Sequence, residues 1–440
     1  MPPANCAPTS GSAYSTPESL HALPRHRWYV IKEGFAPELL ASAISEFPIT
    51  KNELVIDPFC GSGTLPLAAS LRGYRSVGIE VNPFLAFAAR TKTLSCDSDS
   101  LTKGVSSVLP AIRKGAISPL EHFSTFCEQE DSEKWLFNRA ILRCFQGGWQ
   151  AAQCLTGPAS EIVKLMLVRA AMETCNAVAD GKCLRYRKGW PSLRFGKADF
   201  IERFESWSMK AREDLREEPT VRAASIILGD ARRVLEALDA GEPSLCVTSP
   251  PYLNSFDYSD VYRPETFLIG AVRSNHELRA VRLASLRSHV QVKWADPTTN
   301  DFGPTYEQTM VRLGRKKDAF WDSRLPKMVQ AYFEDMRRVM KALKAVVRTR
   351  ARLWLVVSTS AYAGIEVPVD SILAQIGDRV GWFLHDIVVL RHLRASGQHA
   401  VRVPGEEIKP FHLRESLVVL GTEPIGRKAV QRTAACSKTT

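Results

Sequence analysis

A short apolar strand that runs directly into a glycine turn is the feature that most constrains how this chain can fold. The strand covers residues 53–56, and the turn, which carries two glycines, covers 57–64. A helical stretch at 65–72 and a second apolar strand at 76–79 follow at once. A strand, a turn, a helix and a further strand in this order form the opening unit of an open α/β sheet. We therefore predict an α/β fold.

Five later segments complete a set of seven predicted strands. Each is a short apolar run, and helical stretches at 232–238, 330–345 and 369–380 separate most of them. Apolar strands that alternate with helices are typical of a mostly parallel sheet covered on both faces. The pattern predicts a seven-stranded, mostly parallel, Rossmann-like sheet whose last two strands form a close pair. The five segments are 225–228, 245–247, 353–358, 386–390 and 416–420.

Two long segments interrupt this alternation. Residues 91–220 have a mainly helical pattern without a clear strand, and residues 258–327 are rich in arginine and aromatic side chains. Both follow the carboxyl ends of predicted strands, where open α/β folds bind their ligands. The predicted organisation comprises flexible tails at 1–20 and 426–440, a helical insertion at 96–220, and one α/β domain in two parts, 21–95 and 221–425, the second of which contains a basic insertion at 258–327.

The composition excludes several classes of protein. The 440 residues carry 58 Lys and Arg against 47 Asp and Glu, a net charge of +11. Such a chain often meets a polyanion, although a merely soluble basic protein fits the charge equally well. The ten cysteines include no CxxC pair and no zinc-like spacing, which predicts buried thiols in a reducing cytoplasm and no metal. The apolar runs are too short to cross a membrane, and residues 1–17 lack the apolar core of a signal peptide.

The glycine turn is suited to holding a small cofactor. Its backbone N–H groups are exposed, and its glycines let a ligand approach the main chain closely. The turn lacks the third glycine of a dinucleotide fingerprint. Glu80 closes the second strand about 20 residues further on, where a carboxylate can bind ribose hydroxyls, and Asp230 follows the third strand, where it can accept from an adenine amino group. The alternative interpretation makes Phe59 a core residue and Glu80 a strand-end ion pair.

Two strings also resemble the motifs of a known family. The string DPFCGSGT at 57–64 and the string TSPPY at 248–252 resemble the cofactor and catalytic motifs of the amino-methylating DNA methyltransferases, which act on cytosine N4 or adenine N6. The resemblance implies the methyltransferase form of the α/β sheet and S-adenosylmethionine as the cofactor. Residues 32–38 are similar to the family segment that closes over the methionine part of that cofactor. The predicted cofactor-binding residues are Lys32, Asp57, Pro58, Phe59, Cys60, Gly61, Ser62, Gly63, Thr64, Glu80 and Asp230.

The second string predicts the catalytic chemistry. The exocyclic amine of a base is a poor nucleophile because its lone pair is delocalised into the ring. Acceptors aimed at its N–H groups favour the tetrahedral form, and the Ser249 hydroxyl and the Pro250 carbonyl can serve. Pro250 and Pro251 fix the backbone, so these acceptors are preorganised. Tyr252 can stack on a base flipped out of the duplex, and its ring face suits the cofactor's sulfonium.

The residue at the first position of the tetrapeptide bears on the target base. By the resemblance, Ser249 is typical of cytosine-N4 enzymes, whereas Asp or Asn there is typical of adenine-N6 enzymes, and some serine versions modify adenine. Cytosine-C5 methylation is excluded because neither Cys60 in the turn nor Cys246 in the strand occupies the place of a nucleophilic cysteine. Three alternatives stay open: adenine-N6 methylation, RNA guanine-N2 methylation, since the tRNA enzymes share the glycine turn, and a nucleic-acid-binding protein without catalysis.

The insertions are the candidates for DNA contact. Runs such as KCLRYRKGW at 182–190 interleave cations with aromatic rings, which suits phosphates and bases, although each run can also be a solvated basic face. The motif order, with the cofactor motif first, departs from the commonest permutation of cytosine-N4 enzymes. The string RESL at 414–417 is also similar to bacterial DNA methylases, so DNA and cognate restriction or defence proteins are the expected partners. The predicted nucleic-acid-binding residues are Arg185, Arg187, Lys188, Arg194, Lys197, Arg315, Lys316, Lys317, Arg391 and Arg394.

Overall fold

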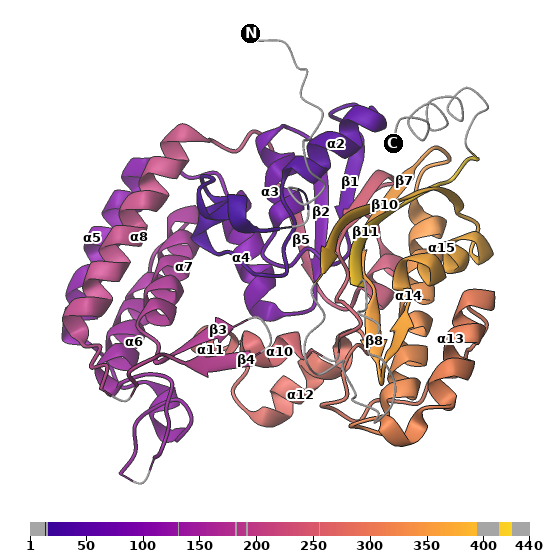
Figure 1. Cartoon of the computed structure of the whole chain (residues 1–440). Coiled ribbons are helices and arrows are strands. Elements are labelled where there is room, and N and C mark those ends of the chain that lie inside the picture. The colour runs from indigo at the N-terminus through magenta and orange to yellow at the C-terminus, as the bar shows by residue number, and fades with distance from the viewer. Residues whose placement is uncertain are drawn as a thin grey trace.

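A seven-stranded sheet forms the centre of the molecule (Figure 1). The computed structural model describes residue 14 and residues 16–130, 132–180, 183–190, 192–254, 256–393 and 413–424. The strands lie in the order β10-β11-β7-β6-β1-β2-β5, and only β11 runs against its neighbours. This confirms the predicted α/β fold, its mostly parallel sheet and its terminal strand pair. The strands are β1 (Leu54–Asp57), β2 (Arg75–Glu80), β5 (Ser225–Leu228), β6 (Pro243–Thr248), β7 (Arg352–Ser358), β10 (Phe383–Leu393) and β11 (Leu413–Gly421).

Helices cover both faces of the sheet because successive strand residues point to opposite sides. In β1, Leu54 and Ile56 pack with one group of helices, while Val55 packs with the other. The first group consists of α9 (Ala231–Val234), η4 (Leu235–Ala237), α13 (Pro304–Gly314), α14 (Leu325–Val346) and α15 (Val369–Arg379). The second group consists of α2 (Glu38–Glu46) and α3 (Thr64–Leu71). Strands β1, β2, β6, β7 and β11 are buried on both sides over most of their length, as their apolar runs predict, whereas the edge strands β5 and β10 are partly exposed.

A layer of long helices lies beside the sheet, at the left of Figure 1. It contains α5 (Ser98–Lys114), α6 (Arg139–Gln153), α7 (Pro158–Glu173) and α8 (Lys197–Glu217), and α4 (Pro83–Thr93) joins it to the sheet. One apolar core runs from this layer into the segment at 28–31. Helices α5 and α6 cross closely at Gly147, where an added Cβ would lie 2.3 Å from the Ala111 carbonyl oxygen.

The prediction that residues 91–220 contain no strand was wrong. A two-stranded hairpin, β3 (Ala177–Asp180) and β4 (Cys183–Tyr186), lies within them. Each strand has only four residues and is half-exposed, so it lacks the apolar run by which the other strands are recognised. The hairpin packs against α10, which lies under the carboxyl ends of the main sheet.

Short helices fill the region after β6. They are α10 (Tyr258–Val261), α11 (Arg263–Leu268) and α12 (Asn275–Ala284). The remaining elements are η1 (Glu18–His21), η2 (His26–Trp28), η3 (Pro119–His122), η5 (Lys317–Ala319), β8 (Ser360–Tyr362) and β9 (Ile365–Val367). Within the described ranges, no helix is long and apolar enough to span a bilayer, and no group of three potential metal ligands occurs.

Candidate active site

A cavity of about 250 Å³ opens at the carboxyl ends of β1, β2, β5 and β6. Its wall brings together parts of the chain that are far apart in sequence: the segment before β1, the glycine turn, the tetrapeptide after β6 and the end strands β10 and β11. Open α/β sheets bind ligands at this edge. The predicted site residues that line the cavity are Lys32, Pro58, Phe59, Gly61, Glu80, Asp230, Ser249, Pro250, Pro251, Tyr252 and Arg391.

Glu80 holds the glycine turn in shape. Its carboxylate accepts hydrogen bonds from the backbone N–H groups of Gly61, at 2.9 Å, and Asn82, at 2.8 Å. Burial raises the pKa of Glu80 to about 7, although these N–H donors act in the opposite direction. Gly61 has a φ of +51° and lines the cavity. The turn therefore presents main-chain atoms and one carboxylate to a ligand.

Other residues of the turn lie behind the cavity wall and shape it. The Cys60 thiol packs over Gly78, and the Ser62 hydroxyl accepts a hydrogen bond from the buried ammonium of Lys92. That ammonium also donates to the Tyr29 carbonyl, which fastens the N-terminal segment to the turn. The remaining predicted cofactor residues behind the wall are Gly63 and Thr64, at which α3 begins, and Asp57.

Asp57 joins the cofactor motif to the catalytic motif. Its carboxylate accepts a 2.6 Å hydrogen bond from the Thr248 hydroxyl, although the two residues are 191 positions apart in the chain. Strands β1 and β6 are neighbours, so their carboxyl ends meet at this point. The second carboxylate oxygen of Asp57 is buried and has no hydrogen-bond partner among the described residues, and burial raises the pKa of Asp57 to about 7.

Asp230 lines the cavity but is already paired. Its carboxylate forms an ion pair with the Arg232 guanidinium at 2.9 Å, and Arg232 reaches Asp335 at 2.8 Å on the other side. Hydrogen bonds from Arg232 to the carbonyls of Ala284 and Ser285 fix the end of α12 in place. The carboxylate of Asp230 is thus held in one orientation while its edge faces the cavity.

The tyrosine of the tetrapeptide is also tied down. The Tyr252 hydroxyl donates to Glu415 of β11 at 2.5 Å, and Glu415 accepts from the Arg391 guanidinium of β10 at 2.6 Å. The Glu415 side chain is only 2% exposed. Burial, followed by the neighbouring Glu415 carboxylate, raises the pKa of Tyr252 well above its usual range. Arg391, which the sequence predicts as a phosphate contact, is therefore an internal ion-pair partner in this structure.

Several residues of the cavity wall carry no separate sequence prediction. Glu33 accepts a hydrogen bond from Tyr262 at 2.7 Å, and burial raises the pKa of its carboxyl. Asp257 pairs with Arg282 of α12 at 2.7 Å and lies near His289. Glu33 adjoins Lys32 in a family-like segment, which is a signal that sequence reasoning can use. The partners of Asp257 and Glu415 lie far away in the chain and leave no local signal.

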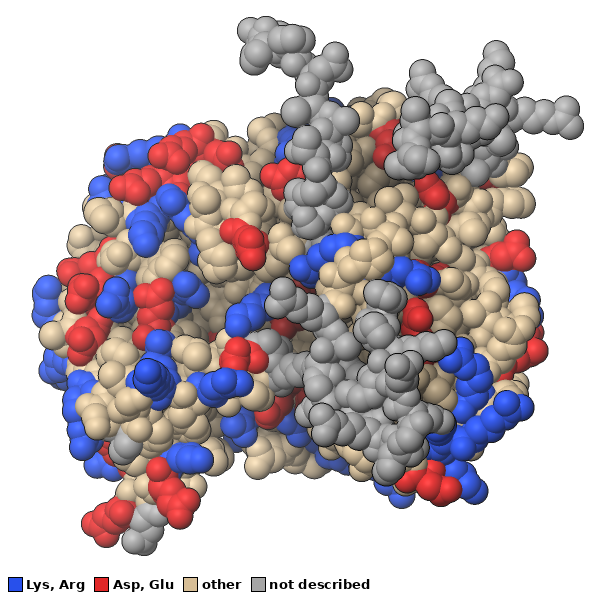
Figure 2. Space-filling view, viewed as in Figure 1, with Lys and Arg blue, Asp and Glu red and all other residues tan. Residues whose placement is uncertain are grey.

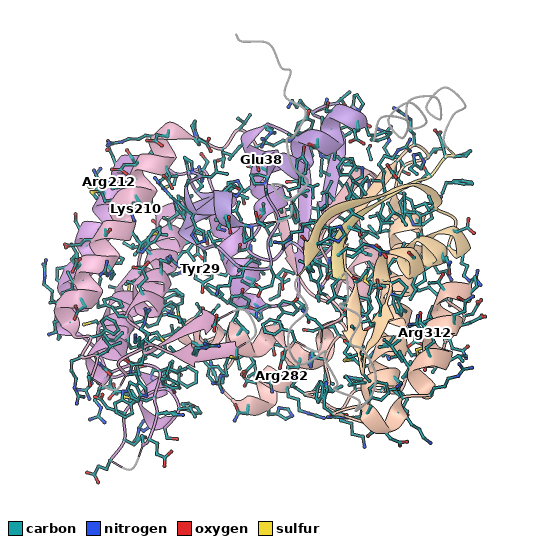
Figure 3. The ribbon with its side chains drawn as sticks, in the orientation of Figure 1. Tyr29, Glu38, Lys210, Arg212, Arg282 and Arg312 are labelled. Carbon is teal, nitrogen blue, oxygen red and sulfur yellow. The ribbon has the colours of Figure 1, made fainter. Side chains whose placement is uncertain are left out.

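The basic residues predicted to bind nucleic acid do not form one cluster. Arg185 pairs with Asp180, and Arg187 and Lys197 donate to backbone carbonyls within the helical layer. Lys188, Arg194, Arg315 and Lys317 are exposed, Lys316 is half-buried, and Arg394 lies outside the described residues. Figure 2 shows cations gathered at the lower right, in the region of α13, and mixed with acidic side chains over the helical layer. Figure 3 places the exposed Arg312 of α13 on the opposite side of the molecule from Lys210 of α8.

The hydrogen-bond acceptors and carboxylates of this cavity fit S-adenosylmethionine. The cofactor carries a sulfonium, an ammonium and ribose hydroxyls, all of which favour acceptors, and the wall offers the carboxylates of Glu33, Glu80 and Asp230. Aromatic faces from Phe59 and Tyr252 complete a lining suited to a cation with a flat purine. The unpartnered carboxylate oxygen of Asp57 lies immediately behind the turn.

Comparison with known proteins agrees with this reading. Residues 32–90 match the model of a DNA methylase family, N6_N4_Mtase. The Type II methyltransferase M.BsoBI of Geobacillus stearothermophilus is 23% identical, over 90% of this chain and 85% of that protein. The Type II methyltransferase M.AvaI of Anabaena variabilis is 23% identical, over 83% of this chain and 81% of that protein. A solved rRNA methyltransferase, aviRa of Streptomyces viridochromogenes, aligns over 94% of this chain and 91% of that chain with 13% identity and a TM-score of 0.30.

The sheet, the two motifs and these relatives agree on one class of enzyme. The chain is similar to the amino-methylating DNA methyltransferases, a family that uses S-adenosylmethionine, through the family model at residues 32–90 and through low-identity relatives along most of its length. Its cofactor is therefore S-adenosylmethionine.

Proposed function

We propose that this protein transfers the methyl group of S-adenosylmethionine to the exocyclic N4 amine of cytosine in DNA. The observation that carries the proposal is that one cavity is lined both by the glycine turn and by the tetrapeptide that begins at Ser249. The family model and the Type II relatives support DNA as the polymer. The serine at the first position of the tetrapeptide supports cytosine. We also propose a cognate restriction enzyme as a partner of this protein.

The chain's own groups perform the steps that the amine requires. S-adenosylmethionine supplies an electrophilic methyl group when bound. The Ser249 hydroxyl and the Pro250 carbonyl accept the amine's hydrogens, which localises the nitrogen lone pair for attack. The ring of Tyr252 forms one wall for the base. A base in a duplex cannot reach a recess of this kind, so the target nucleotide is flipped out of the stack.

The cofactor follows the cavity wall in the order of its residues. Asp230 would hold its adenine, Glu80 its ribose, and Gly61 with residues 31–33 its methionine part. An added Cβ on Gly61 would lie 2.7 Å from the Ile31 side chain, so this segment and the turn are in close contact. Glu33 and Lys32 then face the ammonium and the carboxylate of the methionine part, respectively.

Binding of the cofactor is expected to release a proton through Glu80. In the free protein this pKa is about 7, so much of Glu80 is protonated just below neutral pH. Ribose hydroxyls donate to the ionised form and lower the pKa, which expels the proton. By the same logic, Glu80 contributes stability to the free protein that is present below pH 4.5 and is lost as the pH rises through about 7.

The measurement is titration calorimetry near pH 6.5 in two buffers that differ in ionisation enthalpy. We expect the wild type to release up to about one proton per cofactor and Glu80→Gln to release much less. Asp57→Asn serves as the matched control, since its pKa is raised by the same cause. Equal release by the wild type and Glu80→Gln contradicts the ribose assignment.

Glu33 is expected to discriminate between cofactor analogues. Replacing it with glutamine removes the charge that faces the ammonium, so S-adenosylmethionine should bind about tenfold more weakly. Binding of 5′-methylthioadenosine, which lacks the amino-acid part, should change little. Glu38→Gln, an exposed carboxylate in the same segment, is the control. If both ligands lose affinity equally, Glu33 does not bind the ammonium; if neither does and only turnover falls, Glu33 contacts the base instead.

Nucleoside mass spectrometry tests the function itself. Purified protein is incubated with isotopically labelled S-adenosylmethionine and duplex DNA, or with transfer RNA in parallel. Labelled N4-methylcytosine from the DNA is the expected product. Labelled N6-methyladenine overturns the choice of cytosine and leaves the site intact. Label found only in RNA overturns DNA as the polymer.

A further inference from the structure

A chain of polar contacts connects the catalytic serine with the opposite edge of the sheet. It runs from Ser249 through the Tyr252 hydroxyl to Glu415 and ends at Arg391, and all four residues line the cavity. Ser249 and Tyr252 line the same cavity, and hydrogen bonding from the Ser249 side chain acts to lower the pKa of Tyr252, while the Tyr252 hydroxyl donates to Glu415. Two of these residues lie in the tetrapeptide, and the other two come from the antiparallel strand pair β10 and β11.

We propose that Glu415 is a positioning residue that sets the direction of this chain, so that Ser249 turns its lone pairs toward the target amine. The inference rests on the proposed function, since it concerns how Ser249 acts as an acceptor. Glu415 lines the cavity and accepts from the Tyr252 hydroxyl. It acts through Tyr252.

The direction follows from what each group can donate. An ionised carboxylate only accepts, and the Arg391 guanidinium, which only donates, favours that ionised form. The Tyr252 hydroxyl has one proton, and Glu415 takes it. The oxygen of Tyr252 then has only lone pairs left for Ser249, so the Ser249 proton points toward Tyr252. Ser249 keeps its own lone pairs free for the incoming N–H group.

The reverse direction would disable the site. If the proton of Ser249 pointed at the amine, a donor would face a donor, and the lone pair of the amine would be bonded rather than free to attack. A hydroxyl rotates freely between these two states unless a partner selects one. The Glu415 carboxylate, a fixed acceptor at the far end of these polar contacts, selects one orientation of the Ser249 hydroxyl before the substrate arrives. The site is preorganised in this sense.

The two faces of β11 provide a matched control. Glu415 faces the cavity, whereas its neighbours Arg414 and Ser416 bond Asp370 of α15. Arg414 also pairs with Glu366 at 3.6 Å, a half-exposed carboxylate outside the cavity wall. Glu366→Gln therefore removes an ion pair at the same strand without touching Tyr252. It separates loss of charge near β11 from loss of the acceptor that the proposal needs.

The experiment measures single-turnover methyl transfer to DNA together with cofactor affinity and thermal stability. The variants are Glu415→Met, which removes the acceptor at similar volume, Glu415→Gln, which restores an amide oxygen, and Tyr252→Phe, which keeps the ring. We expect Glu415→Met to lower the rate about 10- to 100-fold with cofactor affinity unchanged within about twofold. Glu415→Gln should recover part of this loss, and Glu366→Gln should match the wild type.

Coupling supplies a readout that a purely structural role would not give. If Glu415 acts through Tyr252, the double variant Tyr252→Phe with Glu415→Met is no slower than Tyr252→Phe alone. The proposal is overturned if the rate losses of the two single variants multiply in the double variant. It is also overturned if Glu415→Met keeps the wild-type rate, or if its rate loss follows a loss of cofactor affinity or thermal stability. Failure of the proposed function looks different, because the wild type itself then yields no labelled N4-methylcytosine. If the wild type methylates adenine instead, the role of Glu415 can still be tested by comparing the transfer rates of the variants with that of the wild type.

Discussion

Ser249→Ala is expected to slow methyl transfer about 100- to 1000-fold, the usual cost of removing one preorganised group that stabilises a transition state. Alanine keeps the backbone of the tetrapeptide but removes the acceptor that localises the lone pair of the amine. The loss should appear in the single-turnover rate, whereas the dissociation constants for cofactor and DNA change little, because the interaction strengthens only as the amine becomes tetrahedral.

Ser244→Ala is the control for this result. Ser244 lies in β6, the strand that leads to Ser249, and is buried at its amino end, where its hydroxyl donates to Glu53 at 2.8 Å. That variant should lose a little stability and keep its transfer rate. If Ser249→Ala retains the wild-type rate, or loses it only together with cofactor binding, the catalytic assignment of the tetrapeptide fails.

Gly63→Ala is expected to destabilise the protein by about 2–4 kcal/mol, the sum of backbone strain and overpacking. Gly63 has a φ of +86°, and an added Cβ would lie 2.7 Å from the Cβ of Ala89 and 2.8 Å from its Cα. Because Ala89 belongs to the buried helix α4, the turn must move instead, and cofactor affinity should fall with stability. Denaturant unfolding and cofactor titration measure the two effects.

Gly157→Ala isolates the backbone contribution to this effect. Gly157 has a φ of +72°, close to that of Gly63, but no atom lies within 4 Å of its added Cβ. This variant should cost only about 1 kcal/mol and leave cofactor affinity unchanged. Equal destabilisation by the two substitutions would show that contact with Ala89 is unimportant.

The sequence predicted the sheet well because its signals are local. Most of the main strands contain a short apolar run, so β1 and β6 are recognisable without knowledge of their partners. The hairpin β3–β4 was missed because its strands are short and half-exposed. Its stability depends on packing against neighbouring elements such as α10, which no local pattern reveals.

The sequence predicted those site residues that belong to a contiguous motif. The residues around Gly61 and Ser249 follow family-like motifs, and they line one cavity. Glu415 and Asp257 depend on partners from other elements, so the sequence could not assign them a role. Arg391, predicted as a nucleic-acid contact, pairs with Glu415 of the neighbouring strand, a partner that no local string reveals.

The bond between Thr248 and Asp57 has a consequence for how such enzymes can change. The two residues are 191 positions apart in the sequence, but they lie at the ends of the neighbouring strands β1 and β6. The distance between the cofactor motif and the catalytic motif is therefore set by the pairing of these strands and not by the segment that connects them. The helical layer lies outside this pair of strands, although its apolar core continues into the segment at 28–31. Reconnection of the strands in another order is therefore expected to keep the two motifs together, as long as β1 and β6 remain neighbours.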